Sequence, residues 1–279
     1  MMNIGIVGLG LIGGSLAKAF KYADQTVYGI DKNPLTTEIA KMSDIIDDSL
    51  EGKIKDCDFI FIAVDANSTV EFVKENAKEF NKSCVVIDCC GVKEVVCEPC
   101  FKIASENNFC FIGGHPMAGT QFSGLKHSKH DMFKNANMVL VPKENEDLLI
   151  LQRVKDLLKL AGFSSVSITT AKKHDEVIAF TSQLAHVVSN AYVKSPNAKI
   201  HKGFSAGSYK DLTRVAWLNE EMWATLFMQN KENISFEIQN IIDELTKYND
   251  AIKNNDYDTL KKLLKEGREC KERCDKHDD

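Results

Sequence analysis

The 279-residue chain contains no long hydrophobic run and no excess of positive charge. Its longest apolar stretches, such as residues 59–64, have the length of a β-strand and fall far short of the ~20 residues that a membrane-spanning helix needs. The formal net charge of −5 provides no general attraction to nucleic acid or to anionic lipid. We therefore expect neither a membrane protein nor a nucleic-acid-binding protein.

Internal repeats and low-complexity linkers are also missing. Residues 3–7 already have the pattern of a β-strand, so we expect no signal peptide and a cytoplasmic protein. The composition, with 44% hydrophobic and 27% charged residues, is typical of globular proteins. The length is sufficient for two domains, the second of about 100 residues.

Cysteine, in contrast, is abundant, with nine residues. In a cytoplasmic chain this odd number indicates reduced thiols rather than a disulfide framework. Cys97 and Cys100, like Cys270 and Cys274, have spacings that metal ligands can have, but structural zinc sites usually combine two tight pairs close in sequence. We expect no metal site.

Seven short apolar runs alternate with helical stretches over the first 170 residues, and helices alone follow. Parallel strands joined by helices produce the first pattern. We therefore predict an α/β fold in which a Rossmann-type, doubly wound, mostly parallel sheet is followed by an all-α second domain. The predicted domains are residues 1–168 and 169–279. The expected strands are residues 3–7, 26–30, 59–64, 84–88, 109–113, 138–142 and 164–169.

The second domain is expected to consist of long helices with apolar stripes. In residues 171–195 apolar side chains recur at alternating steps of three and four, which is the spacing of one helix face. A further helix is expected over residues 220–254, and a solvated helical tail from residue 256 onward. Such stripes are often buried against a second copy, so we expect a homodimer formed through the helical domain. The first stripe consists of Val177, Phe180, Leu184, Val187 and Ala191.

A glycine-rich segment, residues 8–13, follows the first expected strand and precedes a helix. Its glycines allow a tight turn and the close approach of a pyrophosphate, which the N–H groups of the helix would bind. With Asp31 at the end of the second strand, the pattern predicts a dinucleotide site. The Asp31 carboxylate would repel a 2′-phosphate and so favours NAD over NADP, although Lys32 would soften that repulsion. The expected cofactor-binding residues are Gly8, Gly10, Leu11, Ile12, Gly13, Asp31 and Val64.

His115 differs from the other six histidines in its position. It follows the apolar run of residues 109–113, in the segment His-Pro-Met-Ala-Gly-Thr. The carboxyl end of a sheet strand is where an α/β enzyme places groups that face its cofactor. A neutral imidazole, with an ordinary pKa near ~6.5, suits a general base. The alternative interpretation is a histidine that only caps a turn.

Further segments occur together with these two motifs. They are Lys-Asp-Leu-Thr-Arg-Val-Ala at 210–216, His-Asp at 174–175, Ser-Gln-Leu-Ala-His at 182–186, Met-Trp at 222–223 and Asn-Lys at 230–231. In this combination the chain resembles the prephenate dehydrogenases and their arogenate-using relatives, over residues 4–233. That family carries out an oxidative decarboxylation in tyrosine biosynthesis. A hydride passes from the hydroxyl-bearing ring carbon to the nicotinamide, a base takes the hydroxyl proton, and loss of carbon dioxide makes the ring aromatic.

The resemblance implies roles for individual residues. His115 matches the family's catalytic histidine, and Arg214 matches the arginine whose planar group grips a substrate carboxylate. His186 matches a histidine near the substrate, Trp223 is expected to pack the pocket wall, and Asp211 would orient Arg214 or cap a helix. The implied substrate is prephenate or arogenate. The implied substrate-binding residues are Arg214, His186, Gly207, Asp211, Trp223, Thr120 and Gln121. The His-Asp pair at 174–175 is expected to cap a helix or to form hydrogen bonds between the domains, without a catalytic role.

Three positions depart from the family pattern. Gly91 stands where the family often has a serine that hydrogen-bonds to the catalytic histidine, and Ser68, Thr120 or a water molecule are candidates to replace that hydroxyl group. Gln121 stands where many members have glutamate. Asp65 stands where proline is common, and we expect it to cap the helix that follows.

We therefore expect an NAD-dependent prephenate dehydrogenase. Arogenate dehydrogenase is the alternative within the family, because arogenate differs only in an amino group where prephenate has a keto group. An alternative from another class is a dinucleotide-binding sensor without catalysis. Gly91 favours the sensor, whereas the presence of both His115 and Arg214 argues against it.

Overall fold

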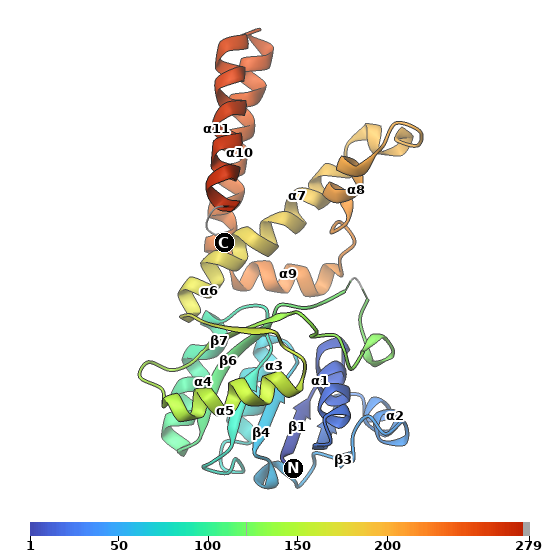
Figure 1. Ribbon diagram of the computed structural model, residues 1–279, viewed down its shortest axis with the longest axis vertical. Helices are drawn as coiled ribbons and strands as arrows, with labels where there is room; N and C mark the ends of the chain where they lie inside the picture. Colours follow the sequence, from blue (N-terminus) through green and yellow to red (C-terminus); the bar gives the residue numbers. More distant parts are fainter. Residues whose placement is uncertain (121, 276–279) are drawn as a thin grey trace.

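The computed structural model describes residues 1–120 and 122–275. Its first part contains an eight-stranded sheet with the order β3-β2-β1-β4-β5-β6-β7-β8 (Figure 1). The order reverses between β1 and β4, and α/β proteins bind ligands at such a point, at the carboxyl ends of the strands. The strands are β1 (Asn3–Val7), β2 (Thr26–Ile30), β3 (Asp48–Ser49), β4 (Phe59–Ile62), β5 (Val85–Asp88), β6 (Cys110–Pro116), β7 (Asn137–Val141) and β8 (Ser165–Ile168).

Helices cover both faces of the sheet. In β4, Phe59 and Phe61 belong to the core that includes residues of α1 and α5, whereas Ile60 and Ile62 belong to the core that includes residues of α3 and α4. Burial on both faces explains why the strands are continuous apolar runs in the sequence. The helices of this part are α1 (Leu11–Tyr22), α2 (Pro34–Met42), α3 (Ala66–Glu75), α4 (Glu94–Asn107) and α5 (Leu148–Leu160), with 3₁₀ turns at Ile54–Asp56 and Leu125–His127.

Strand β6 pairs with its two neighbours over different lengths. It runs parallel to β5 up to Ile112 and antiparallel to β7 up to Pro116. The strand therefore continues beyond its pairing with β5, and this extension carries His115. In the part of the chain that the structure describes, β6–β7 is the one antiparallel pair, so the predicted mostly parallel, doubly wound sheet is confirmed.

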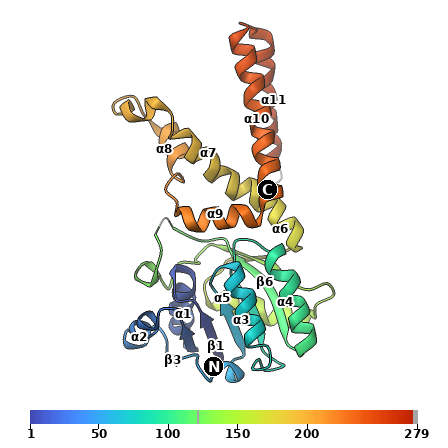
Figure 2. The same cartoon turned by 180° about the vertical axis from the view of Figure 1, so that it is seen from behind.

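The second part of the chain is helical, as predicted. Both views place α9 between the sheet and α7, while α10 and α11 form a hairpin that projects away from the sheet (Figure 1 and Figure 2). The helices are α6 (Ala171–Ile178), α7 (Ala185–Tyr192), α8 (Gly207–Thr213), α9 (Glu220–Gln229), α10 (Lys231–Lys253) and α11 (Tyr257–Asp275), with a π-helical segment at Ala179–Leu184 and a 3₁₀ turn at Pro196–Ile200. Among the described residues, none of the helices combines the length and the apolar character that crossing a membrane requires.

The helical part differs from the prediction in three respects. The helix expected over residues 171–195 contains the π-helical segment, the helix expected over residues 220–254 is two helices that meet at Asn230, and the bounds of α8 were not predicted. The π-helical segment also disrupts the predicted apolar stripe, because it changes the number of residues per turn. Leu184 is buried, but Phe180 is 61% exposed.

Candidate active site

The glycine-rich turn after β1 is shaped by two glycines that no other residue could replace without strain. Gly8 has a φ of +85°, and a Cβ atom there would lie 2.6 Å from the carbonyl oxygen of Ala63. A Cβ atom on Gly13 would lie 1.8 Å from the carbonyl oxygen of Gly8. A Cβ atom on Gly10 would meet no protein atom within 4 Å. Gly10 therefore borders open space, whereas Gly8 and Gly13 allow the backbone to pack closely.

Helix α1 begins at this turn with its N-terminal N–H groups available. Its N-cap is Gly10, no side chain caps it, and its first turn has no acidic residue. An uncapped helix N-terminus beside open space suits a phosphate group. Asp31, at the end of β2, accepts hydrogen bonds from the N–H of Leu9 at 2.8 Å and the N–H of Asn33 at 2.9 Å, which hold its carboxylate beside the turn. These residues fit a dinucleotide.

The end of β4 lies beside the glycine-rich turn. Val64 is partly buried, and its Cγ1 atom lies 2.6 Å from the position of a Cβ atom on Gly8. Asp65 caps α3 by accepting hydrogen bonds from the N–H and the hydroxyl group of Ser68, at 3.0 and 2.6 Å. The prediction that Asp65 caps a helix is confirmed.

The side chain of His115 contacts a histidine from the helical domain. The distance between its Nδ1 atom and Nε2 of His174, on α6, is 2.9 Å. Nδ1 of His174 in turn lies 2.7 Å from an oxygen of Asp175. Because a carboxylate only accepts, His174 donates from Nδ1 and accepts at Nε2, so His115 donates from Nδ1. The lone pair of a neutral His115 is then on Nε2.

The side of His115 that carries Nε2 faces Gly91. A Cβ atom on Gly91 would lie 4.0 Å from Nε2 of His115 and 3.3 Å from Cδ2 of Leu226, on α9. The two residues proposed to replace the missing serine are engaged elsewhere: Ser68 contacts Asp65, and Thr120 accepts a hydrogen bond from the N–H of Phe122 at 3.2 Å. His174, which the sequence analysis did not assign to the site, is the residue that contacts His115.

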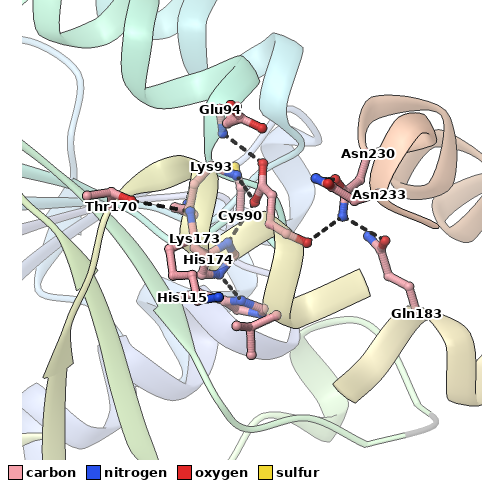
Figure 3. A network of polar contacts seen from close by, with 12 residues as sticks. Cys90, Lys93, Glu94, His115, Thr170, Lys173, His174, Gln183, Asn230 and Asn233 are labelled. Carbon is pink, nitrogen blue, oxygen red and sulfur yellow. Dashed lines mark hydrogen bonds and ion pairs between the residues drawn. The ribbon is translucent and has the colours of Figure 1, made fainter. Parts of the chain in front are cut away.

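Asp175 joins the helical domain to the sheet domain. Its two carboxylate oxygens accept hydrogen bonds from the N–H groups of Lys93 and Glu94, at 2.8 and 2.9 Å, where α4 begins. Its carbonyl oxygen accepts a hydrogen bond from the side chain of Asn230, which also donates to the side-chain oxygen of Gln183, both at 2.9 Å (Figure 3). The prediction that the His-Asp pair forms capping or interdomain hydrogen bonds is confirmed, and its contact with His115 is additional.

A buried ion pair lies next to the backbone that carries His115. The side chains of Lys93 and Asp88 are fully buried and form a salt bridge. Asp88 also accepts a hydrogen bond from the N–H of Gly114 at 3.0 Å, one residue before His115. Burial, the neighbouring His174 and the positive charge of Lys93 hold the pKa of His115 well below its ordinary value of 6.5. The site therefore keeps His115 neutral, as a base requires.

His186 and Trp223 form a stacked pair. Their ring centres are 3.8 Å apart with an angle of 28° between the planes. Nδ1 of His186 donates to the carbonyl oxygen of Ser182 at 2.9 Å, so Nε2 is its acceptor atom when the ring is neutral. Trp223 lies one helical turn before Leu226, so α9 connects this pair to the surroundings of His115.

Other residues implied by the family resemblance lie away from these contacts. Gly207, Asp211 and Arg214 are exposed, and neither Asp211 nor Arg214 has a side-chain hydrogen bond or ion pair within residues 1–120 and 122–275. The predicted contact between Asp211 and Arg214 is therefore absent there, and α8 has no side-chain cap. Gln121 lies outside the described residues.

The sequence analysis also assigned no role to Lys93 or Leu226 and expected no contact between the His-Asp pair and His115. The His-Asp pair at 174–175 was a visible signal, but its distance of 59 residues from His115 concealed the contact. All nine cysteines are free, and the described residues contain no group of three or more side chains arranged to hold a metal ion.

A glycine-rich turn and a neutral histidine at the same edge of a parallel sheet, under a helical second domain, define the class of two-domain dinucleotide-dependent dehydrogenases. Two family models match the chain. Residues 16–167 match the model described as "Prephenate dehydrogenase, nucleotide-binding domain", and residues 170–266 match "Prephenate dehydrogenase, dimerization domain". The chain belongs to the prephenate dehydrogenase family of oxidoreductases.

Individual relatives agree with this family. A prephenate dehydrogenase of Lactococcus lactis is 30% identical over 287 residues, covering 99% of this chain and 78% of the relative. The structure of prephenate dehydrogenase from Aquifex aeolicus in complex with hydroxyphenyl propionate and NAD+ has a TM-score of 0.85 at 28% identity, covering 98% of each chain. The structure of Synechocystis arogenate dehydrogenase has a TM-score of 0.82 at 26% identity, covering 98% of this chain and 99% of that chain.

Proposed function

We propose that the protein catalyses the NAD-dependent oxidative decarboxylation of prephenate to 4-hydroxyphenylpyruvate, a step of tyrosine biosynthesis. The observation that supports this proposal most directly is the protonation state and tautomer of His115. Its ring is kept neutral and donates from Nδ1 to His174, so that Nε2 is available as a base at the carboxyl edge of the sheet.

The cofactor residues in this proposal are those around the glycine-rich turn. The uncapped N-terminus of α1 would bind the pyrophosphate, and Asp31 would bind the ribose hydroxyl groups, which favours NAD over NADP. The complex of the related Aquifex aeolicus enzyme with NAD+ supports the same cofactor. The proposed residues are Gly8, Gly10, Leu11, Ile12, Gly13, Asp31 and Val64.

The substrate residues act on the carboxylates and on the hydroxyl group. Nε2 of His115 would accept the hydroxyl proton as carbon dioxide leaves. NAD, when bound, would supply the acceptor for the hydride. Arg214 carries a positive charge with no ion-pair partner among the described residues, so it is free to bind a carboxylate. His186 would lie near the substrate, and Trp223 would form the wall behind it. Gly207, Asp211, Thr120 and Gln121 complete the proposed substrate-binding set.

The proposal includes two domains, residues 1–168 and 169–279, and a homodimer formed through the second. The match of residues 170–266 to a dimerization domain supports the homodimer. So do the exposed apolar side chains on the helices, such as Phe236 and Leu245, which are 64% and 60% exposed. Nine free thiols support an enzyme of the reducing cytoplasm.

The test is the formation of NADH by the purified protein with prephenate or arogenate, each with NAD and with NADP. Turnover is expected with prephenate and NAD, and the variant His115→Asn is expected to lose about 100-fold or more of kcat, because it lacks the base. Turnover with arogenate alone would show arogenate dehydrogenase, which the similarity to the Synechocystis enzyme favours as the second candidate. Binding of NAD without turnover of either substrate would show a sensor and contradict the proposal.

A further inference from the structure

His115 has one side-chain hydrogen bond among the described residues, and it is made to His174. Gly91 offers no hydroxyl group, and Leu226 presents only carbon atoms there. The orientation and the tautomer of His115 therefore depend on the helical domain.

We propose that His174 and Asp175 are positioning residues, which fix His115 in the tautomer with a free Nε2 and share the positive charge that His115 acquires. The proposal rests on the proposed function, in which His115 is the base. The proton moves from the substrate hydroxyl group to Nε2 of His115, while the proton on Nδ1 remains hydrogen-bonded to His174. When carbon dioxide leaves, the ring oxygen becomes a phenolate and takes the proton back from Nε2, so no proton leaves the site during the reaction.

The first argument is geometric. His174 and Asp175 are 3% and 1% exposed, so water does not compete for the hydrogen bonds that they form. The Asp175 carboxylate is held by two backbone N–H groups of α4, which cannot rotate as a side chain can. A fixed carboxylate determines which nitrogen of His174 carries the proton, and His174 then determines the same for His115. This order of contacts, carboxylate to imidazole to reacting atom, is that of a catalytic triad, with a second imidazole in place of the nucleophile.

The second argument concerns the charges around the two rings. Lys93, the residue before α4, is paired with Asp88 from β5, and its positive charge lowers the pKa of His115. Asp175 from α6 is then the negative charge in direct contact with the histidine pair, and Glu94 lies beside it at the start of α4. When His115 becomes an imidazolium, its Nδ1–H points along the line of hydrogen bonds to Asp175. The carboxylate therefore stabilises the charge that forms during the reaction.

Kinetics of two substitutions at one position provide the first test. His174→Leu removes the acceptor, so kcat is expected to fall about 10- to 100-fold while KM for prephenate changes less than about two-fold, because His174 contacts the base and not the substrate. His174→Gln keeps an acceptor near the ε position and is expected to recover most of the lost kcat. The matched control is His130→Leu, at an exposed histidine beside Tyr22, which is expected to keep the kcat of the unsubstituted enzyme.

The second test requires no turnover. In protein with ¹⁵N-labelled histidine, the imidazole signals of His115 are assigned by their loss in His115→Asn. At neutral pH, Nδ1 is expected to be protonated and Nε2 unprotonated, and the Nε2–H form is expected to increase in His174→Leu.

The outcomes separate this proposal from the proposed function. An Nε2–H tautomer in the unsubstituted protein, or an unchanged kcat in folded His174→Leu, would overturn the positioning role even if prephenate is turned over. The expected tautomer in a protein that turns over no substrate would support the hydrogen-bond arrangement and reject the proposed function alone.

Discussion

His115, the proposed base, is partly buried, and the loss of solvent around its ring affects both its reactivity and the stability of the fold. Burial, His174 and Lys93 lower its pKa well below 6.5, so the folded protein keeps it neutral at a pH where the unfolded chain already binds a proton. Its contribution to stability is therefore fully present above pH 6.5 and is lost as the pH falls below that value.

This leads to a prediction for stability and activity against pH. Between pH 7.5 and 5.5 the urea midpoint of the unsubstituted protein is expected to fall more than that of His115→Asn, because the variant has no such group. For prephenate, kcat/KM is expected to stay level as the pH falls through 6.5, since the base remains neutral. His130→Asn, at an exposed position, serves as the control and is expected to keep the unsubstituted slope. Equal slopes for the unsubstituted protein and His115→Asn would show that His115 is not buried as a neutral ring.

Among individual residues, the sequence predicted His115 as a site residue but not that His174 contacts it. A histidine after an apolar run has a recognisable position, whereas the contact between His115 and His174 crosses from one domain to the other and leaves no periodic pattern. Gly91 was recognised as a missing hydroxyl group, but which group contacts His115 instead depends on how α6 meets α4.

Among the secondary-structure elements, the glycine-rich turn and α1 allow a matched pair of substitutions. Gly10→Ala places a methyl group in open space, so the melting temperature is expected to remain within about 2 °C while NAD binding weakens. Gly13→Ala places it 1.8 Å from the carbonyl oxygen of Gly8, so both the melting temperature and NAD binding are expected to fall. Thermal unfolding and calorimetric titration with NAD measure the two effects. Unchanged NAD affinity in Gly10→Ala would contradict the assignment of this space to the cofactor.

Most elements could be predicted, and the exceptions have physical causes. Strands buried on both faces leave apolar runs, whereas β3 has two residues and leaves none. The extension of β6 includes Gly114, His115 and Pro116, which have weak strand preferences and are held by pairing with β7. The π-helical segment and the break at Asn230 depend on tertiary contacts, since the Asn230 side chain binds Asp175 and Gln183.

For the whole molecule, the arrangement of α10 and α11 indicates how two copies would associate. The hairpin projects from the sheet domain (Figure 2), and large apolar side chains remain exposed on α10, among them Phe236, Ile242, Leu245 and Ile252. Patches of this kind on helices are typical of protein interfaces.

The corresponding prediction concerns oligomeric state. The protein is expected to be a dimer by light scattering, and Leu245→Asp is expected to raise the dimer dissociation constant about 10-fold or more, because it places a charge in an apolar contact. The control is Asn240→Asp, an exposed polar residue of the same helix, which is expected to remain dimeric. A monomer at all concentrations for the unsubstituted protein would reject the homodimer.

The hydrogen bonds of Asp175 also limit how α6 can move relative to α4. Pulling α6 away from α4 would leave a buried carboxylate without its backbone donors, at a cost of about 1–3 kcal/mol for each lost partner. We therefore expect any movement of the helical domain to be a rotation about Asp175, with the largest displacement at the distant end of α7 and α8. In such a rotation, the displacement of each atom increases with its distance from Asp175. Because His174 is adjacent to Asp175, we expect its contact with His115 to persist during such a rotation.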